Sequence, residues 1–211
     1  MEEIQNVGDR LKDVLMKLWT IIGIVQIISA VPHLARAELA AVAALSAKEG
    51  MDDDATRVRL NEFLLFEKQR EGSRYRERDA EEGIEQKGLD FMLRTYRHNL
   101  PAIMATWGRH QADFEWLQMR IIYGLFLADE SIISGVEMEI AVVPAIMAQD
   151  VRGPTYWHVR GLQRLGVSVE DADVVLDVVR TGAKWAGREL KETGSLTARD
   201  VDVELVPRDA A

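Results

Sequence analysis

Two side chains capable of acid–base chemistry, Glu139 and His158, lie on either side of a short break in an otherwise helical stretch, residues 134–166. Glu139 lies near the start of the first predicted helix, and the second predicted helix begins around Gly153 and Pro154, because Gly and Pro interrupt helices. So short a turn places the two helices antiparallel and in contact. A carboxylate and an imidazole that meet between them can share a proton, which is general acid–base chemistry.

The apolar run after Glu139, which includes Ile140, Val142 and Val143, should disfavour the charged form of the carboxylate and so make it a better base. Glu139 could then take a proton from carbon next to a carbonyl, and His158 could stabilise or protonate the enolate. This chemistry requires no metal and no organic cofactor. The alternative is a buried Glu–His hydrogen bond that only ties two helices together.

Three further residues are candidates for substrate binding. Tyr123 precedes the Glu139 helix, and its hydroxyl could orient a substrate oxygen. Trp157 and Arg160 flank His158 on the second helix. Arg160 could hold a substrate carboxylate, although a solvated side chain is the favoured alternative.

The order of these features resembles the carboxymuconolactone decarboxylase and alkylhydroperoxidase D superfamily over residues 121–187. A helix carries Glu139, and then come a turn, the Trp157-His158 pair and a Gly-Val-Ser-x-Glu-Asp restart. In the peroxidase branch the Glu is followed by Cys-x-x-Cys-x-x-x-His. Pro154 and Val151 occupy the two Cys positions here, so dithiol peroxide reduction is excluded.

The resemblance implies an all-α, alkylhydroperoxidase D-like helical bundle with an antiparallel helix hairpin at the site. The decarboxylase branch lacks the Cys pair and works on a lactone by proton transfer. It implies a cofactor-independent lyase or isomerase acting on a small lactone or enolisable carbonyl compound. The alternative is a non-catalytic oligomeric scaffold or small-molecule-binding member of the same fold. Relatives usually form trimers or hexamers, so we expect a homo-oligomer, a dimer included.

Two departures from the family pattern are Pro144 and the Gly153-Pro154 turn, which replaces the usual thiol turn. Pro144 lies inside the Glu139 helix, where it should remove a backbone hydrogen bond and kink the helix. The added tail and long charged segment are typical of fungal versions, some of which act in natural-product pathways. A polyketide-type substrate is therefore expected.

Composition narrows the function classes. Hydrophobic residues make up 47% of the 211 residues, enough for a packed core. The net charge of −9 disfavours nonspecific nucleic-acid binding, which needs a basic surface. The absence of cysteine excludes disulfides, thiolate catalysis and Cys-ligated zinc, and it fits a cytoplasmic protein. Residues 52–54 are three aspartates, which we interpret as a helix N-terminus rather than a metal site.

The most apolar run, residues 18–31, is shorter than the roughly 20 residues of a membrane span. Pro32 should end a helix at Val31. We therefore predict a buried helix here and no membrane association. The acidic start lacks the basic and apolar regions of a signal peptide.

Two helical blocks, residues 10–66 and 101–187, flank a highly charged segment, residues 67–88. We predict one domain over residues 1–190 with this segment as an internal linker. Residues 191–211 lack helical periodicity and should form an extended or disordered tail, or lie on a neighbouring subunit.

Overall fold

The computed structural model describes residues 1–69 and 74–201 and divides the chain into two compact units, Met1–Glu82 and Gly83–Ala211. Every regular element in the described part is helical, so the all-α prediction is confirmed. The boundary falls inside the charged segment predicted as a linker, of which residues 70–73 lie outside the described residues. That the two units behave as one domain stays a prediction.

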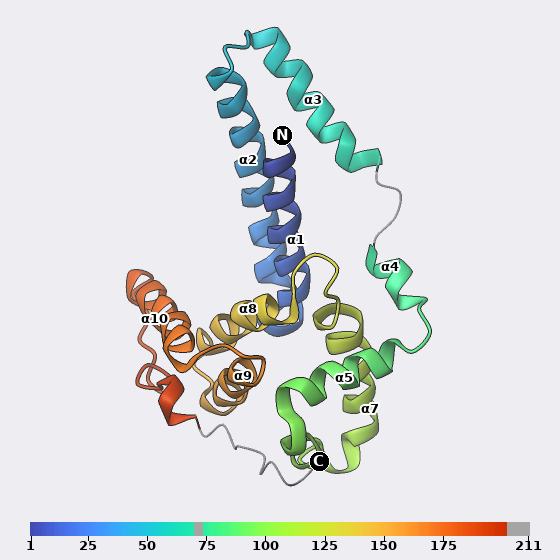
Figure 1. The fold of residues 1–211 in the computed structure, drawn as a ribbon, viewed down its shortest axis with the longest axis vertical. Coiled ribbons are helices and arrows are strands. Elements are labelled where there is room, and N and C mark those ends of the chain that lie inside the picture. Colours follow the sequence, from blue (N-terminus) through green and yellow to red (C-terminus); the bar gives the residue numbers. More distant parts are fainter. Residues whose placement is uncertain (70–73, 202–211) are drawn as a thin grey trace. The chain divides into compact units, whose positions relative to one another are not determined.

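Unit 1 is built on a long helix hairpin. Its elements are α1 (Glu2–Ile22), α2 (Ile24–Lys48), α3 (Asp53–Gln69) and α4 (Arg74–Asp79). Helices α1 and α2 lie side by side (Figure 1), and a single residue, Gly23 with φ 93°, turns the chain between them. Asp52 caps α3, because its Oδ1 accepts a hydrogen bond from the Ala55 N–H at 2.8 Å. The interpretation of the three aspartates as a helix start is therefore confirmed for Asp52.

Helix α2 corrects the prediction for the most apolar run. The helix continues through Pro32, and the break comes at Gly23 instead. Pro32 lacks the N–H that would reach the Ile28 carbonyl, but Ile28 is 62% exposed, so water can satisfy that carbonyl. Ile24, Val25 and Ile28 are all exposed, so the prediction of a buried helix is wrong. By length and composition alone, α2 could cross a membrane.

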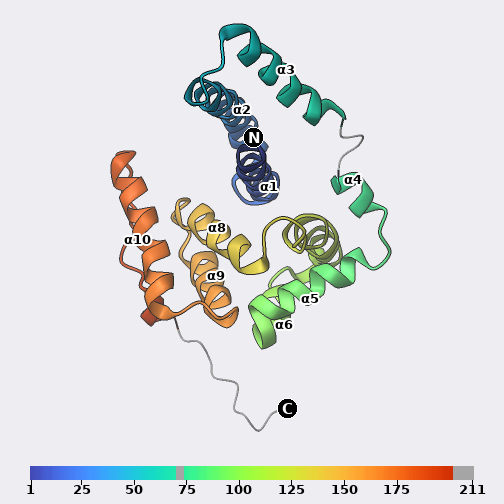
Figure 2. The same cartoon turned by 45° about the horizontal axis from the view of Figure 1, so that its top comes forward.

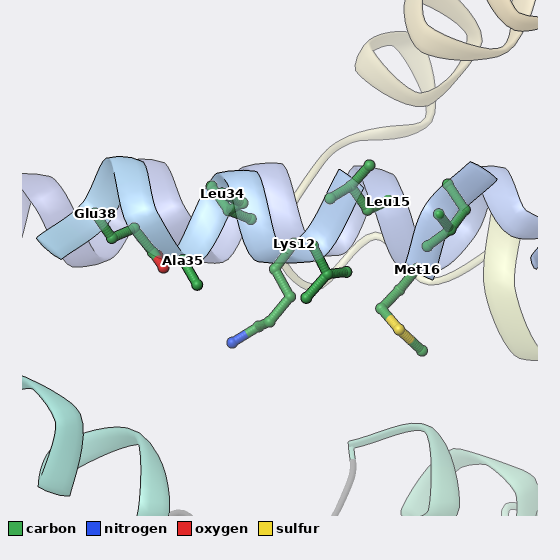
Figure 3. Close-up of a pocket in the computed structure, with 8 residues that line it drawn as sticks. Lys12, Leu15, Met16, Leu34, Ala35 and Glu38 are labelled. Carbon is green, nitrogen blue, oxygen red and sulfur yellow. The ribbon is translucent and has the colours of Figure 1, made fainter. Parts of the chain in front are cut away.

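A mostly apolar pocket lies along the α1–α2 hairpin (Figure 3), with a volume of about 130 Å³. Lys12 and Met16 line it from α1, and Leu34 and Glu38 line it from α2. Unit 1 thus keeps substantial apolar area on its surface. Large exposed apolar patches are typical of interaction sites.

Unit 2 contains the predicted helix hairpin (Figure 2). Its helices are α5 (Ile84–Tyr96), α6 (Leu100–Ala105), α7 (Gln111–Trp116), α8 (Gly135–Met147), α9 (Arg152–Arg164) and α10 (Val169–Trp185). A π-helical segment, η3 (Leu117–Leu127), follows α7, and short 3₁₀ turns span Arg97–Asn99, Gly108–His110 and Ala198–Asp200. Helix α8 continues through Pro144, and α9 is followed by Gly166 with φ 101°, the left-handed residue predicted there.

The chain after α10 packs against the unit, so the prediction of an extended tail is wrong for residues 191–201. Leu196, Ala198 and Val201 are buried in one apolar cluster with side chains of α8, α9 and α10. The tail is also held by polar contacts that its sequence does not reveal, because they come from distant residues. The remainder of the predicted tail, residues 202–211, lies outside the described residues.

Asp150, in the turn between α8 and α9, makes the main polar contact with this tail. Its carboxylate accepts hydrogen bonds from the N–H groups of Lys191, Glu192 and Thr193 and from the Thr193 hydroxyl, at 2.8–3.2 Å. Partial desolvation acts to raise the pKa of Asp150, but the hydrogen bonds outweigh it and the pKa is lowered from 3.8. The Asp150 carboxylate is therefore ionised when it holds the tail.

Helix α5 crosses η3 at two glycines. A Cβ on Gly88 would lie 2.0 Å from the Met119 carbonyl oxygen, and one on Gly124 would lie 2.6 Å from the Ile84 carbonyl oxygen. Both obstacles are backbone atoms, which cannot move aside as a flexible side chain can. The two helical segments can therefore approach this closely only with glycine at both positions.

Gly88→Ala is predicted to lower the free energy of unfolding by about 1–3 kcal/mol or more, because the new methyl group forces α5 away from η3. The matched control is Gly182→Ala in α10, where nothing lies within 4 Å of the added Cβ. That change should raise stability by about 0.5–1 kcal/mol. Urea denaturation of both variants measures the difference, and equal effects would contradict the close crossing.

Asp150→Asn is predicted to release the tail, because asparagine keeps the left-handed backbone of this residue (φ 58°) but loses the negative charge. A lowered pKa means that the carboxylate stabilises the fold above its unfolded pKa, near 3.8, and that this stabilisation is lost as pH falls through the lower folded pKa. The stability gap between wild type and variant should therefore be constant near neutral pH and shrink below about pH 4.

The measurement is hydrogen exchange of residues 191–201, followed together with the unfolding midpoint across pH. Faster exchange confined to the tail in Asp150→Asn is the expected result. A stability gap that persists unchanged at acid pH would show that the charge of Asp150 is not what holds the tail.

Candidate functional site

The predicted contact between Glu139 and His158 is present. Glu139 Oε2 and His158 Nδ1 are 2.9 Å apart, with Glu139 fully buried on α8 and His158 only 6% exposed on α9. Helix α8 begins with a capping box, in which Ser134 and Glu137 bond each other's backbone N–H groups. This leaves Glu137 exposed at the cap, and it turns Glu139 inward.

A glycine sets the distance between α9 and α5. A Cβ on Gly161 would lie 2.4 Å from Thr95 Cγ2, so α9 can approach the end of α5 only because residue 161 has no side chain. His158 is one helical turn before Gly161 and faces the same side of α9. The close approach therefore brings the imidazole to Tyr96, the last residue of α5.

Two tyrosine hydroxyls extend the Glu139–His158 contact. The Tyr96 hydroxyl is 2.9 Å from His158 Nε2, and the Tyr123 hydroxyl is 2.6 Å from that of Tyr96. Both tyrosines are buried, and the Tyr96 ring meets the Tyr123 and His158 rings edge-on. Tyr123 comes from the π-helical segment, a distortion that is frequent at functional sites. The four side chains form one continuous hydrogen-bonded chain from four different helical segments.

One atom of the site has no partner. Among the described residues, no donor lies within hydrogen-bonding distance of Glu139 Oε1, which is fully buried. An unsatisfied buried acceptor costs roughly 1–3 kcal/mol, and more when the group is charged. Oε1 is therefore an acceptor with unused hydrogen-bonding capacity, which one further donor would satisfy.

The two phenols are held in their neutral form. Burial raises the pKa of Tyr96 above its ordinary value of 10; the hydrogen bond with Tyr123 opposes this and the charge of Glu139 adds to it. Burial raises the pKa of Tyr123 as well, with smaller contributions from Tyr96 and Glu139. Both side chains are thus neutral hydroxyls at physiological pH, which can donate hydrogen bonds but do not act as phenolate bases.

The structure places the other predicted residues as follows. Tyr123 belongs to the hydrogen-bonded chain, whereas Trp157 is 37% exposed at the surface of α9. Arg160 bonds Asn99 Oδ1 at 2.8 Å and lies over the Tyr156 ring, so it is tied into the fold and not freely solvated. Its role as a substrate ligand stays a prediction.

Tyr96 is a member of the site that the sequence does not identify, because nothing in its local sequence distinguishes it from a core tyrosine. Two arginines of α9 fix this helix end. Arg164 donates to the Thr95 and Tyr96 carbonyls at 3.0 and 2.7 Å, and Arg160 and Arg164 both donate to Asn99. Cations at a helix C-terminus are stabilising because its carbonyls lack intrahelical partners.

Within the described ranges, no three His, Asp or Glu side chains are placed to hold a metal ion. The site offers a carboxylate, an imidazole and two phenols, which are the parts of an acid–base system.

Gly161→Ala is predicted to push α9 from α5, to lower the free energy of unfolding by about 1–3 kcal/mol, and to break the His158–Tyr96 hydrogen bond. The matched control is the double variant with Thr95→Ser, which removes the obstructing Cγ2 methyl group. Thermal denaturation should show the double variant to be more stable than Gly161→Ala alone. If Thr95→Ser gives no relief, the clash is not what the substitution introduces.

Comparison with known proteins identifies no relative. No family model matches the chain, and no curated protein or solved structure matches it.

Proposed function

We propose that the protein is a cofactor-independent lyase or isomerase that moves a proton on a small lactone or another enolisable carbonyl compound. The single observation that carries this proposal is the Glu139 carboxylate. One of its oxygens is bound to His158 at 2.9 Å, and the other is buried without a partner. A carboxylate held in this way is oriented and short of one proton donor, which is the state a general base needs.

The proposed step begins with Glu139 Oε1 accepting a proton from the carbon next to the substrate carbonyl. The electron pair of that C–H bond moves to the carbonyl oxygen and gives an enolate. His158 holds the other carboxylate oxygen and adjusts its basicity through the shared hydrogen bond. The proton then returns to another carbon, or to a leaving group as a bond breaks. General acid–base catalysis of this kind contributes about 10²–10⁴-fold to a rate.

The finer assignment to the carboxymuconolactone decarboxylase and alkylhydroperoxidase D-like superfamily is part of the same proposal. Its support is the order of Glu139, the turn and His158, now with the two side chains in contact. A homo-oligomer is also proposed. The exposed apolar side chains of the α1–α2 hairpin, among them Val7, Leu11 and Val25, favour burial against another copy.

The burial of the pair favours a second candidate, a non-catalytic scaffold or small-molecule binder. Glu139 is fully buried and His158 is 6% exposed, as in a polar tie between two helices. The two candidate functions differ in the role that they assign to the Glu139 carboxylate. In an enzyme the carboxylate is needed for proton transfer, whereas in a scaffold it is needed only for packing and stability.

Glu139→Gln is predicted to reduce proton exchange by at least about 10²-fold while the fold is kept, because glutamine has nearly the same shape but cannot act as a base. The assay follows deuterium incorporation from D₂O into a small β,γ-unsaturated butenolide by NMR. His158→Ala should give a comparable loss. The control is Glu137→Gln, which changes an exposed capping carboxylate and should leave exchange intact.

Thermal denaturation of the same variants separates the two candidates. Loss of exchange with an unchanged unfolding midpoint supports the enzyme. A midpoint that collapses in Glu139→Gln, with no exchange by the wild-type protein, supports the scaffold.

A further inference from the structure

Both ring nitrogens of His158 are engaged inside the protein. Nδ1 lies 2.9 Å from Glu139 Oε2, and Nε2 lies 2.9 Å from the Tyr96 hydroxyl. His158 is 6% exposed, and the Tyr96 ring meets the imidazole edge-on. An imidazole has only these two atoms with which to give or take a proton. Whichever tautomer the ring adopts, both atoms are therefore held by protein groups rather than offered to a substrate.

The proton that the base step delivers to Glu139 leaves these contacts as they are. With Glu139 ionised, the His158 Nδ1–H donates to Oε2, and Nε2 accepts from the Tyr96 hydroxyl. The Tyr96 oxygen then accepts from the Tyr123 hydroxyl. A proton placed on Oε1 leaves Oε2 an acceptor and leaves Nε2 without a hydrogen, so each of these hydrogen bonds keeps its direction. The imidazole and the two phenols are therefore a fixed support for the carboxylate.

Tyr96 is held at both ends, which keeps Nε2 covered. Its hydroxyl lies between His158 Nε2 and the Tyr123 hydroxyl, which is 2.6 Å away, and its carbonyl accepts from Arg164 at 2.7 Å. Burial raises the pKa of Tyr96, so the hydroxyl keeps the hydrogen that it donates. A substrate group that displaced Tyr96 from Nε2 would break its bond to His158 and leave a buried hydroxyl to find another partner, which is unfavourable.

The geometry points to a one-base reaction, in which Glu139 Oε1 both removes the substrate's proton and returns it, while His158 and Tyr96 are positioning residues. This inference rests on the proposed function and narrows it to substrates whose two reacting carbons lie on one face. Glu139 and His158 have four atoms that can carry a transferable proton. In the described part of the chain, three of them are bonded to protein groups and Oε1 is not.

A 1,3-proton shift on a small ring fits a single base of this kind. In a β,γ-unsaturated butenolide, the C–H bond next to the carbonyl breaks, its proton goes to Oε1, and its electron pair forms a dienolate. The dienolate then forms a new C–H bond at the γ-carbon with the same proton, which restores the carbonyl and the ionised carboxylate. The two carbons are separated by one ring atom, so one carboxylate oxygen can serve both.

A deuterium label tests whether the same proton is returned. The butenolide carries deuterium at its α-carbon and is turned over in H₂O, and the γ-position of the first product formed is analysed by ²H NMR. The wild-type protein should place deuterium at the γ-carbon, because Oε1 is buried away from water. Isomerisation by buffer alone is the control, since its proton comes from the solvent and leaves the γ-carbon unlabelled. Exchange with D₂O still accumulates over repeated turnovers, whenever the Oε1 proton is lost before it is returned.

His158→Asn and His158→Gln form a matched pair of variants. The asparagine amide nitrogen takes the place of Nδ1, so it still donates to Glu139 but holds no titratable proton. The glutamine amide instead reaches the place of Nε2 beside Tyr96 and leaves Glu139 without its donor. His158→Asn should stay within about 10-fold of the wild-type exchange rate, whereas His158→Gln and His158→Ala should be slower by at least about 10²-fold. A folded His158→Asn protein as slow as His158→Ala would show that the imidazole itself transfers a proton, and would overturn the inference.

NMR tests the cover on Nε2 without any substrate, because the protein has only four histidines. Histidine is labelled with ¹⁵N in the ring, and the full-length wild type is compared with Tyr96→Phe. The Nε2 signal of His158 should shift when the hydroxyl is removed, and the signals of His33 and His110 should not. An unchanged Nε2 signal would show that this atom is open to a substrate, which contradicts the inference.

The label and the Glu139 variant together separate this inference from the proposed function. If Glu139→Gln abolishes exchange but the wild-type product carries no transferred deuterium, the one-base reaction is wrong and the base step stands. If Glu139→Gln retains exchange, the proposed function fails and the one-base reaction fails with it. Transferred deuterium in the wild type, its loss in Glu139→Gln and activity in His158→Asn are the results expected.

Discussion

The burial of one carboxylate is the constraint on which the site in unit 2 depends. Glu139 is fully buried, and a buried charge is strongly unfavourable unless it is paired and hydrogen-bonded. His158 meets one carboxylate oxygen, and Tyr96 fixes the far side of the same imidazole. The carboxylate is therefore stabilised through a chain of neighbours and not by a single ion pair. A change at any link alters the hydrogen bonds available at the next one.

Close helix approach makes this chain possible, and glycines make the approach possible. Gly161 lets α9 reach the end of α5, and Gly88 and Gly124 let α5 reach η3. Each crossing brings one more member of the chain within hydrogen-bonding distance. Leucine or alanine at these positions would still give amphipathic helices, but would hold the tyrosines and the histidine apart. The specificity of the site thus comes from residues that have no functional group.

Local sequence signals predicted the hairpin and the Glu139–His158 pair, and they named Tyr123 as a candidate, but they did not predict Tyr96 or the hydrogen bonds that join the tyrosines to His158. The Gly153-Pro154 punctuation and Gly166 marked the two helices, and a short turn then made the Glu139–His158 contact a necessary consequence of their spacing. Tyr96 could not be predicted in the same way. It reaches His158 across 62 residues of sequence, and that approach depends on how α5 and α9 cross, which no local pattern encodes.

The errors in unit 1 and in the tail have a related cause. Pro32 favours a helix end because it frees a carbonyl and its ring crowds the preceding turn, but α2 continues through Pro32 at an exposed position, where water can bond the freed carbonyl. The tail after α10 lacks helical periodicity, yet Asp150 gathers its backbone N–H groups and the apolar cluster buries its side chains. In both cases the interaction that decides the local structure comes from outside the segment, from water at Pro32 and from Asp150 and the apolar cluster at the tail.

The burial of Glu139 also bears on whether the Glu139–His158 pair only joins two helices or forms a catalytic centre. A purely structural tie between two helices is often no more stable than well-packed apolar residues of the same volume, because desolvation offsets the attraction. Val143, one turn from Glu139 on α8, is fully buried and packs in one apolar cluster with Val159 and Leu162 of α9, which already joins the two helices of the hairpin. A carboxylate there adds desolvation without adding packing, and Oε1 is left without a donor. A buried carboxylate with an unpaired oxygen lowers the stability of the fold. Natural proteins keep such destabilising groups chiefly at functional sites.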